Sequence, residues 1–175
     1  MAAGPSGCCF LERRIARGCL AVFLHLNDAF SVRGATAGDL RAWARLRTAL
    51  WTDETDAFGN VAEALQRSDA GNFIAFAADG AAVGFAEATL RQDHVNGTDS
   101  SPVGFLEGWY VAADWRGRGV GRALLGAVRD WSRAQGCTEL ASDAMLDDTA
   151  AQRAHAACGF EETERVVYFR MPLDD

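Results

Sequence analysis

Residues 105–122 read FLEGWYVAADWRGRGVGR, which predicts a strand that runs into a glycine-rich turn and then into a helix. The strand is apolar and aromatic, except for Glu107 and Gly108 near its middle. After the turn, leucines and small residues recur at helical spacing as far as Trp131. A carboxylate inside a buried strand is rare unless it is paired or functional. Glu107 is therefore a candidate site residue.

The turn from Arg116 to Arg122 has the composition of a phosphate-binding site. Its glycines allow backbone conformations closed to other residues and leave room for a ligand to approach the chain. Amides at the start of a helix attract anions, and the arginines add formal charge. The spacing, Arg-x-x-Gly-x-Gly, is neither that of a Walker loop nor that of the dinucleotide fingerprint. A glycine-rich turn with solvated arginines remains the alternative.

This turn, placed after a buried strand, resembles the pyrophosphate loop of the GNAT superfamily of acetyltransferases. Three further phrases, HVNGTDSSPVGFLEG, ELASDA and GFEETERVVYF, resemble the aminoglycoside 6'-N-acetyltransferases within that superfamily. The resemblance covers about residues 30–173. It implies a mixed α/β (α+β) fold, in which one mostly antiparallel sheet has splayed parallel strands and helices on both faces. It also implies acetyl-CoA as co-substrate, an aminoglycoside as acceptor and a homodimer.

The resemblance assigns the cofactor-binding residues to the end of the central strand, to the turn and to the start of a later helix. They are Trp109, Tyr110, Val111, Arg116, Gly117, Arg118, Gly119, Val120, Gly121, Arg122 and Asp148. The family usually has Asn at the position of Asp148, and Asp lacks the amide donor. Free strand amides, that of Val111 included, are expected to stabilise the oxyanion. His155 stands where many members carry a Tyr that protonates the leaving thiolate; the alternative is a partly buried structural histidine.

The substrate-binding residues implied by the resemblance are aromatic or acidic, with one histidine where the family commonly has Tyr. They are Trp51, Glu54, His94, Glu107, Asp143 and Glu164. Aminoglycosides are polycations, so carboxylates can position them, and one near the 6'-ammonium can accept its proton. We expect Asp143 to be the catalytic base and Glu107 a binding or relay group. A structural carboxylate remains the alternative for each, and a solvated surface charge is equally open for Glu164.

Composition limits the classes of partner that the protein is expected to bind and the cellular compartment in which it is expected to lie. The chain has 175 residues, a formal net charge of -7 and a pI near 4.9, which indicates one domain and argues against nucleic acid and anionic membranes. No apolar stretch is long enough to span a bilayer. Five cysteines without metal-ligand spacing favour reduced thiols in the cytoplasm and no metal site. Cys137 and Cys158 are interpreted as small buried residues, not as nucleophiles.

The remaining pattern predicts the order of the elements. Residues 1–29 are expected to be a disordered or loosely docked extension, although their basic start and apolar run imitate a signal peptide. Residues 30–175 form the predicted catalytic domain. A capping box at Thr36 and Asp39 precedes the first helix, and Asp79-Gly80 forms a hairpin turn. Expected strands cover residues 30–33, 73–78, 82–90, 105–111, 138–144 and 165–170, the last one finishing the sheet; expected helices cover 40–51, 57–66, 120–131 and 147–157.

Two other functions remain open from the sequence. One is a GNAT enzyme that acetylates a different cationic amine, such as a polyamine or a protein N-terminus. The other is a sensor that binds coenzyme A without turnover. Acidic pocket residues do not separate the first from an aminoglycoside enzyme, because all these acceptors are cationic.

Overall fold

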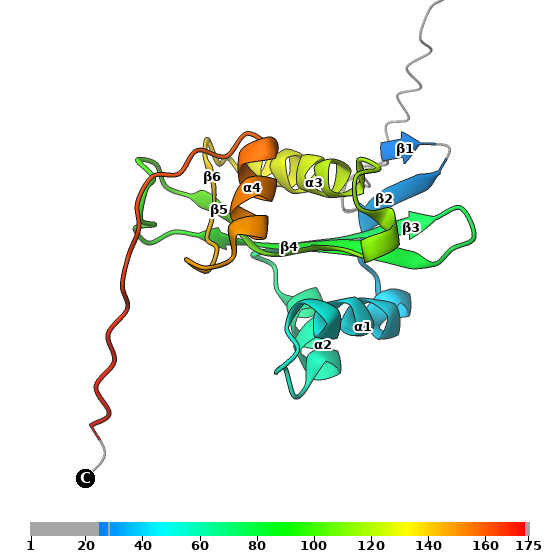
Figure 1. Cartoon of the computed structure of the whole chain (residues 1–175), viewed down its shortest axis with the longest axis horizontal. Helices are drawn as coiled ribbons and strands as arrows, with labels where there is room; N and C mark the ends of the chain where they lie inside the picture. The colour runs from blue at the N-terminus through cyan, green and yellow to red at the C-terminus, as the bar shows by residue number, and fades with distance from the viewer. Residues whose placement is uncertain (1–24, 28, 174–175) are drawn as a thin grey trace, which may run out of the picture.

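The computed structural model describes residues 25–27 and 29–173, which form one six-stranded sheet with helices on both faces (Figure 1). The strands are His25–Asn27 (β1), Phe30–Gly34 (β2), Ala70–Ala77 (β3), Ala82–Arg91 (β4), Val103–Val111 (β5) and Leu140–Ser142 (β6). The helices are Leu40–Leu50 (α1), Ala57–Gln66 (α2), Val120–Ala134 (α3) and Thr149–Ala157 (α4). Short 3-10 turns occupy Ala37–Asp39 and Ala113–Trp115.

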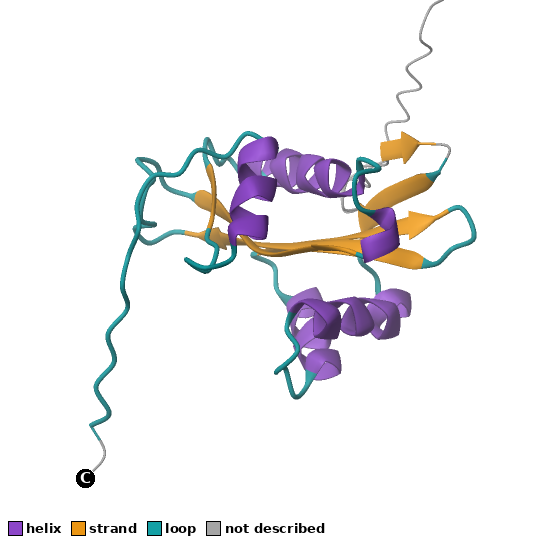
Figure 2. Ribbon diagram, viewed as in Figure 1, coloured by secondary structure: helices purple, strands orange, loops and turns teal. Residues whose placement is uncertain are grey.

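Strand order in the sheet follows chain order. Each of β1 to β5 pairs antiparallel with the next, and β6 pairs parallel with β5 after the crossover through α3. Helices α3 and α4 cover one face, and α1 and α2 cover the other (Figure 2). This is the α/β mixed sheet that the sequence predicts. No helix in the described part of the chain is long and apolar enough to cross a membrane.

Alternation along the strands builds a separate core on each face of the sheet. On the α3 face, Phe73 and Leu106 pack with Leu124 and other buried residues of that helix. On the α1 and α2 face, Trp43 packs with Ile74 and Phe85, and all three are fully buried. The helix α1 presents its apolar stripe to this second core, as its periodicity predicts.

Several local predictions are confirmed. The Asp39 carboxylate accepts a hydrogen bond from the Thr36 amide at 2.8 Å, as expected of the capping box. Gly80 has a φ of 84°, the left-handed conformation that the tight turn between β3 and β4 requires. Gly159, with a φ of 93°, follows the end of α4. The bounds of α2 coincide with the prediction, whereas β6 is shorter than expected.

The last predicted strand is wrong. Residues 165–170 form no strand, and after α4 the chain runs away from the sheet (Figure 1). Val167, Tyr168 and Phe169 are 74%, 85% and 94% exposed. The sequence has strand composition, but a strand also needs a neighbouring backbone to pair with, and the described residues provide none here.

Strand β1 lies within the segment that the sequence assigns to an extension. It pairs with β2, His25 opposite Val32, so the sheet begins before residue 30. Residues 1–24, which hold most of the apolar run that imitates a signal peptide, lie outside the described residues.

Candidate active site

The predicted cofactor groove starts where β5 and β6 separate. Their pairing ends at Leu106 opposite Ser142, while β5 continues to Val111 beside β4 alone. The Ala112 amide donates to the Val83 carbonyl, and amides alternate along an antiparallel strand. The amides of Trp109 and Val111 therefore face away from β4, toward the opening. Nε of Arg116 donates to the Val111 carbonyl at 2.9 Å, which holds the end of the strand.

The turn that follows is open on its outer side. Gly117 and Gly119 have φ values of 73° and 86°, and a Cβ at either would meet nothing within 4 Å. Helix α3 begins at Val120, with Gly119 as its N-cap. Gly117, Arg118 and Gly119 are exposed just before this helix start, and the first amides of a helix have no intrahelical partner. The arrangement has the shape and polarity of an anion cradle.

Other predicted residues of this region have structural contacts. Gly121 lies under Trp109, whose Nε1 donates to the Gly121 carbonyl at 3.1 Å, and a Cβ there would meet the indole at 2.9 Å. The Arg118 guanidinium lies 5.1 Å from the Trp115 ring, and Arg122 donates to the Ala157 carbonyl at 3.1 Å. Arg122 thereby ties the start of α3 to the end of α4.

Asp148 and His155 are both engaged within the fold. The Asp148 carboxylate caps α4 by accepting from the amides of Ala150 and Ala151 at 3.1 and 2.9 Å. His155 has Nδ1 at 2.8 Å from the Ala151 carbonyl and Nε2 at 3.0 Å from Oγ of Ser142. Its ring packs edge-on against Trp109 and Phe160. These contacts fix the orientation of both side chains, and the role of Asp148 toward coenzyme A stays a prediction.

A β-bulge aims Glu107 away from the core. The register passes from Glu87 opposite Gly108 to Ala88 opposite Leu106, so Glu107 is the extra residue of β5. A bulge lets two successive side chains face the same way and bends the strand. Glu107 opens onto a cavity of about 540 Å³, and the Cα of Gly108 faces Trp51. A Cβ on Gly108 would lie 2.4 Å from Cη2 of that indole.

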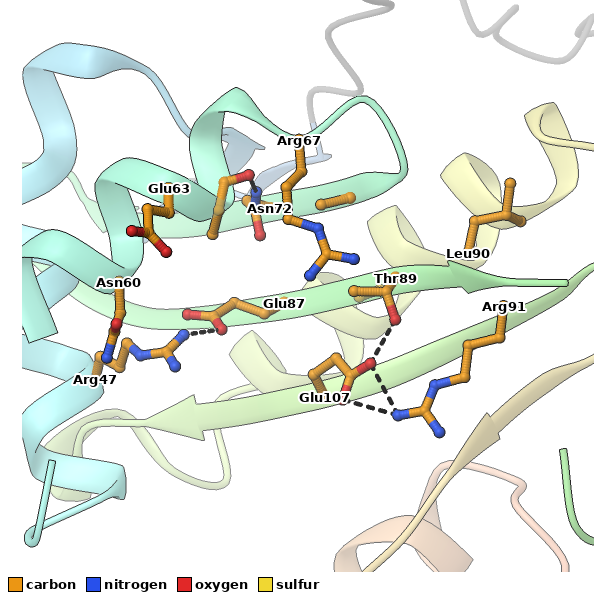
Figure 3. Close-up of a pocket in the computed structure, with 13 residues that line it drawn as sticks. Arg47, Asn60, Glu63, Arg67, Asn72, Glu87, Thr89, Leu90, Arg91 and Glu107 are labelled. Carbon is orange, nitrogen blue, oxygen red and sulfur yellow. Dashed lines mark hydrogen bonds and ion pairs between the residues drawn. The ribbon is translucent and has the colours of Figure 1, made fainter. Parts of the chain in front are cut away.

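The cavity lies between α2 and strands β4 and β5 (Figure 3). Positive and negative side chains from several elements line it. The charged residues are Arg47, Glu63, Arg67, Glu87, Arg91 and Glu107. In Figure 3, the side chains of Thr89 and Arg91 reach Glu107, while Arg47 reaches Glu87.

Arg47 joins the cavity to the aromatic wall. It donates through Nη1 to Glu87 and through Nε to Glu54, the latter at 2.7 Å, and its guanidinium stacks 4.4 Å from the Trp51 ring. Nε1 of Trp43 donates to the same Glu87 carboxylate at 2.7 Å. Burial raises the pKa of the Glu87 carboxyl, and the Arg47 guanidinium opposes that shift. Arg47 thus fixes Trp51 and Glu54, two predicted substrate residues, relative to β4.

The other predicted substrate residues are His94, Asp143 and Glu164, and each lies in a loop or in the segment after α4. Gly97, in the loop with His94, faces Thr163 so closely that a Cβ would lie 2.1 Å from its Oγ1. The loop and the segment that carries Glu164 are therefore neighbours. Asp143 follows β6 directly and is exposed, as are His94 and Glu164. Among residues 25–27 and 29–173, no hydrogen bond or ion pair links Glu107 to Asp143 or to Glu164.

Sequence reasoning missed Arg47, Glu87, Thr89 and Arg91. The signal was present for Glu87, since it interrupts the small apolar run of β4 just as Glu107 interrupts β5. The arginines gave no comparable signal, because each is one of several on the chain and acquires its partner only through the fold. Within the described ranges, no cluster of three or more His, Cys, Asp or Glu residues could hold a metal ion.

Comparison with known proteins places this geometry in a family. The model of the acetyltransferase (GNAT) family matches residues 39–160. The aminoglycoside N(6')-acetyltransferase type 1 of Stenotrophomonas maltophilia is 59% identical over 149 residues, which are 85% of this chain and 97% of that protein. The chain is also similar to a solved structure of AAC(6')-Iy in complex with the bisubstrate analogue CoA-S-monomethyl-acetylneamine, at 45% identity and a TM-score of 0.77. That match covers 82% of this chain and 98% of the other.

A further solved structure, AAC(6')-Iy in complex with CoA, is 42% identical with a TM-score of 0.79 and covers 87% of this chain and 99% of its own. The chain belongs to the GNAT family of acetyltransferases and, within it, to the family of the type 1 aminoglycoside N(6')-acetyltransferases.

Proposed function

We propose that this protein transfers acetyl from acetyl-CoA to the 6'-amine of an aminoglycoside, and so confers resistance to such antibiotics. The observation that carries the proposal is the bulge at Glu107, which presents a carboxylate to an open cavity beside the splayed end of β5. A polycationic acceptor needs such carboxylates for binding and for orientation. The names and bound ligands of the relatives support the same acceptor and the same co-substrate.

The cradle after β5 fits the pyrophosphate of acetyl-CoA. Gly117 and Gly119 leave their Cα positions bare, and the first amides of α3 have no intrahelical partner and would donate to an anion. Arg116, Arg118 and Arg122 add positive charge around it. The strand end, Trp109 to Val111, would contact the pantetheine and the acetyl group. The outward amide of Val111 would donate to the oxyanion that develops on the thioester carbonyl.

Asp143 is proposed as the base. It sits at the end of β6, the strand that diverges from β5, and its exposure lets it take the ammonium proton directly or through water. The freed amine then attacks the thioester carbon. As the tetrahedral intermediate collapses, the C–S bond breaks, and the second proton lost from the nitrogen neutralises the thiolate of coenzyme A as it leaves. Glu107 binds an ammonium group of the acceptor or relays its proton. The other residues of the proposed acceptor site are Trp51, Glu54, His94 and Glu164. No acetylated cysteine is needed, and the proposed reaction uses no metal.

The exposed C-terminal segment supports a homodimer. Val166, Val167 and Phe169 are apolar and exposed, and no strand of residues 25–27 and 29–173 pairs with the outer edge of β6. We expect this segment to pair with or pack on a second copy, which would bury those side chains. Sedimentation equilibrium should give twice the monomer mass, and a truncation before residue 164 should give the monomer. A monomer for the full chain at assay concentration would contradict the dimer.

We place the enzyme in the cytoplasm, because the odd number of cysteines in the sequence does not suggest a disulfide framework and, in the described part of the chain, Cys137 and Cys158 are free thiols. We expect neither nucleic acid nor a membrane among its partners, given the net charge of -7.

The test is thiol release from acetyl-CoA with kanamycin, with a 6'-hydroxyl analogue that lacks the amine, and with spermidine. Release with kanamycin alone is expected. Release with spermidine alone would retain the chemistry but overturn the acceptor. No thiol release with any of the three compounds would favour a coenzyme A sensor instead.

The base is tested by Asp143→Asn. We expect kcat to fall by roughly 10²- to 10⁴-fold, while coenzyme A binding is unchanged. An unchanged kcat would reject Asp143 as the base.

A further inference from the structure

Three arginines line a cavity whose proposed ligand is a polycation, and each of them has a carboxylate partner. Arg47 pairs with Glu87 and Glu54, and Arg67 pairs with Asp69 at 2.8 Å. Arg91 pairs with Glu107 through Nη2, at 3.0 and 3.1 Å from the two carboxylate oxygens. Only the last pair uses the bulged carboxylate assigned to the acceptor. An ammonium of the acceptor and Arg91 therefore require the same group.

The geometry of the Arg91–Glu107 pair allows the guanidinium to leave the carboxylate. A single nitrogen meets both oxygens, so the pair lacks the two parallel bonds of a fork-to-fork contact. The Arg91 and Glu107 side chains are 41% and 33% exposed, and water screens such a pair. Arg91 is the last residue of β4, and its long side chain can turn toward solvent without any change in the backbone.

The surroundings nevertheless hold the guanidinium in place while the site is free. It lies 3.3 Å from the centroid of the Phe105 ring, two residues before Glu107 on the same strand. Oγ1 of Thr89 donates to Glu107 as well, so the carboxylate keeps a fixed orientation whether or not Arg91 is present. Figure 3 shows both side chains converging on Glu107 from β4.

We propose that Arg91 occupies the place of a substrate ammonium on Glu107 in the free enzyme, and that the acceptor binds by displacing it. This inference rests on the proposed function. Displacement of Arg91 costs the same for every acceptor, so it lowers the affinity of all acceptors equally. A polycation offsets this cost with contacts at other carboxylates and still binds at low concentration, whereas a monoamine does not. Arg91 thus sets, through competition, the minimum binding energy that an acceptor must supply.

The experiment compares Arg91→Gln with Arg67→Gln, a control that removes the same charge from the same cavity. Arg67 hydrogen-bonds Asp69 and reaches Glu107 only through a weaker coulombic attraction. Arg91→Gln should lower KM for kanamycin by roughly two- to fivefold, or about 0.4–1 kcal/mol, and change kcat by less than about twofold. Arg67→Gln should change KM by less than about twofold. Arg91→Lys keeps a cation and should retain the wild-type KM.

Calorimetric titration of each folded variant with kanamycin separates this inference from the proposed function. If the wild type makes no product yet Arg91→Gln binds kanamycin more tightly, the competition stands and the proposed reaction fails. If the wild type acetylates kanamycin and Arg91→Gln leaves KM and the affinity for kanamycin unchanged, or raises KM and lowers the affinity, the competition is wrong and the proposed reaction stands. Equal effects of Arg91→Gln and Arg67→Gln would reduce the result to net charge and overturn the assignment.

Discussion

Two arginine–glutamate pairs line the same cavity and differ in how the fold holds them. The Arg47 and Glu87 side chains are 18% and 7% exposed, and Trp43 also donates to the carboxylate. The Arg91 and Glu107 side chains are 41% and 33% exposed, at a bulge. The comparison separates two uses of one chemical pair: the buried pair fixes the wall, whereas the exposed pair stays available for exchange with a ligand.

The largest effect is expected from breaking the buried pair. Arg47→Met keeps much of the side-chain volume but leaves the Glu87 carboxylate buried without its cation. We expect the free energy of unfolding to fall by about 3–5 kcal/mol, measured by urea denaturation. Arg91→Met should lower it by less than about 1 kcal/mol. Equal losses for the two variants would remove the distinction between the pairs.

A third ion pair, Arg33 with Asp39, lies outside the cavity. Its buried Asp39 carboxylate is expected to make the free energy of unfolding depend on pH. The Arg33 guanidinium lowers the pKa of the Asp39 carboxyl to about 2 from 3.8, with help from Thr36. Because the unfolded chain binds this proton first, the stabilisation is complete above pH 3.8 and is lost as the pH falls toward 2. We expect about 2 kcal/mol of stability to disappear over that window.

Urea unfolding of the wild type and of Asp39→Asn at several pH values measures this contribution. The difference between the two proteins should shrink as the pH falls through the window. A difference that stays constant would mean that Asp39 titrates normally in the folded state.

The close contact between Gly108, which follows the bulge, and the Trp51 indole is tested by Gly108→Ala. The added Cβ would lie 2.4 Å from the Trp51 indole, so the ring that Arg47 stacks against must move. We expect KM for the acceptor to rise about tenfold, equivalent to about 1.4 kcal/mol, with a smaller change in kcat. In a Trp51→Ala background, the same substitution should have little further effect. Additive effects of the two changes would show that Gly108 acts on something other than Trp51.

The smallest effect is expected from the exposed pair. A double-mutant cycle with Arg91→Ala and Glu107→Gln should give a coupling energy for folding below about 1 kcal/mol. A coupling of several kcal/mol would mean that the pair is structural and would argue against displacement by a ligand.

Prediction from the sequence worked best where the signal is local. The Asp79-Gly80 turn, the capping box at Thr36 and the helix after Gly119 each depend on a few adjacent residues, and all three are confirmed. The cradle of glycines was predicted for the same reason, because the backbone freedom it needs belongs to those residues alone. The resemblance to known acetyltransferases supplied the roles that spacing alone did not.

Prediction failed where a segment depends on a distant neighbour. Residues 165–170 have the composition of a strand, but composition does not provide a pairing partner. Glu107 stood out as an odd carboxylate, yet neither the bulge nor the Arg91 side chain that meets it was visible. Glu87 carried an equal signal in β4 and went unrecognised, because its partner lies 40 residues earlier in α1.

The sequence by itself therefore determined the order of most elements, the glycine-rich turn before α3 and the family. The tertiary structure decided which arginine meets which glutamate and how exposed each pair is. The physical reason is that helix periodicity and turn chemistry act between residues a few positions apart. A bulge and a cross-strand ion pair depend instead on the register between β4 and β5, which is set only when the strands pack.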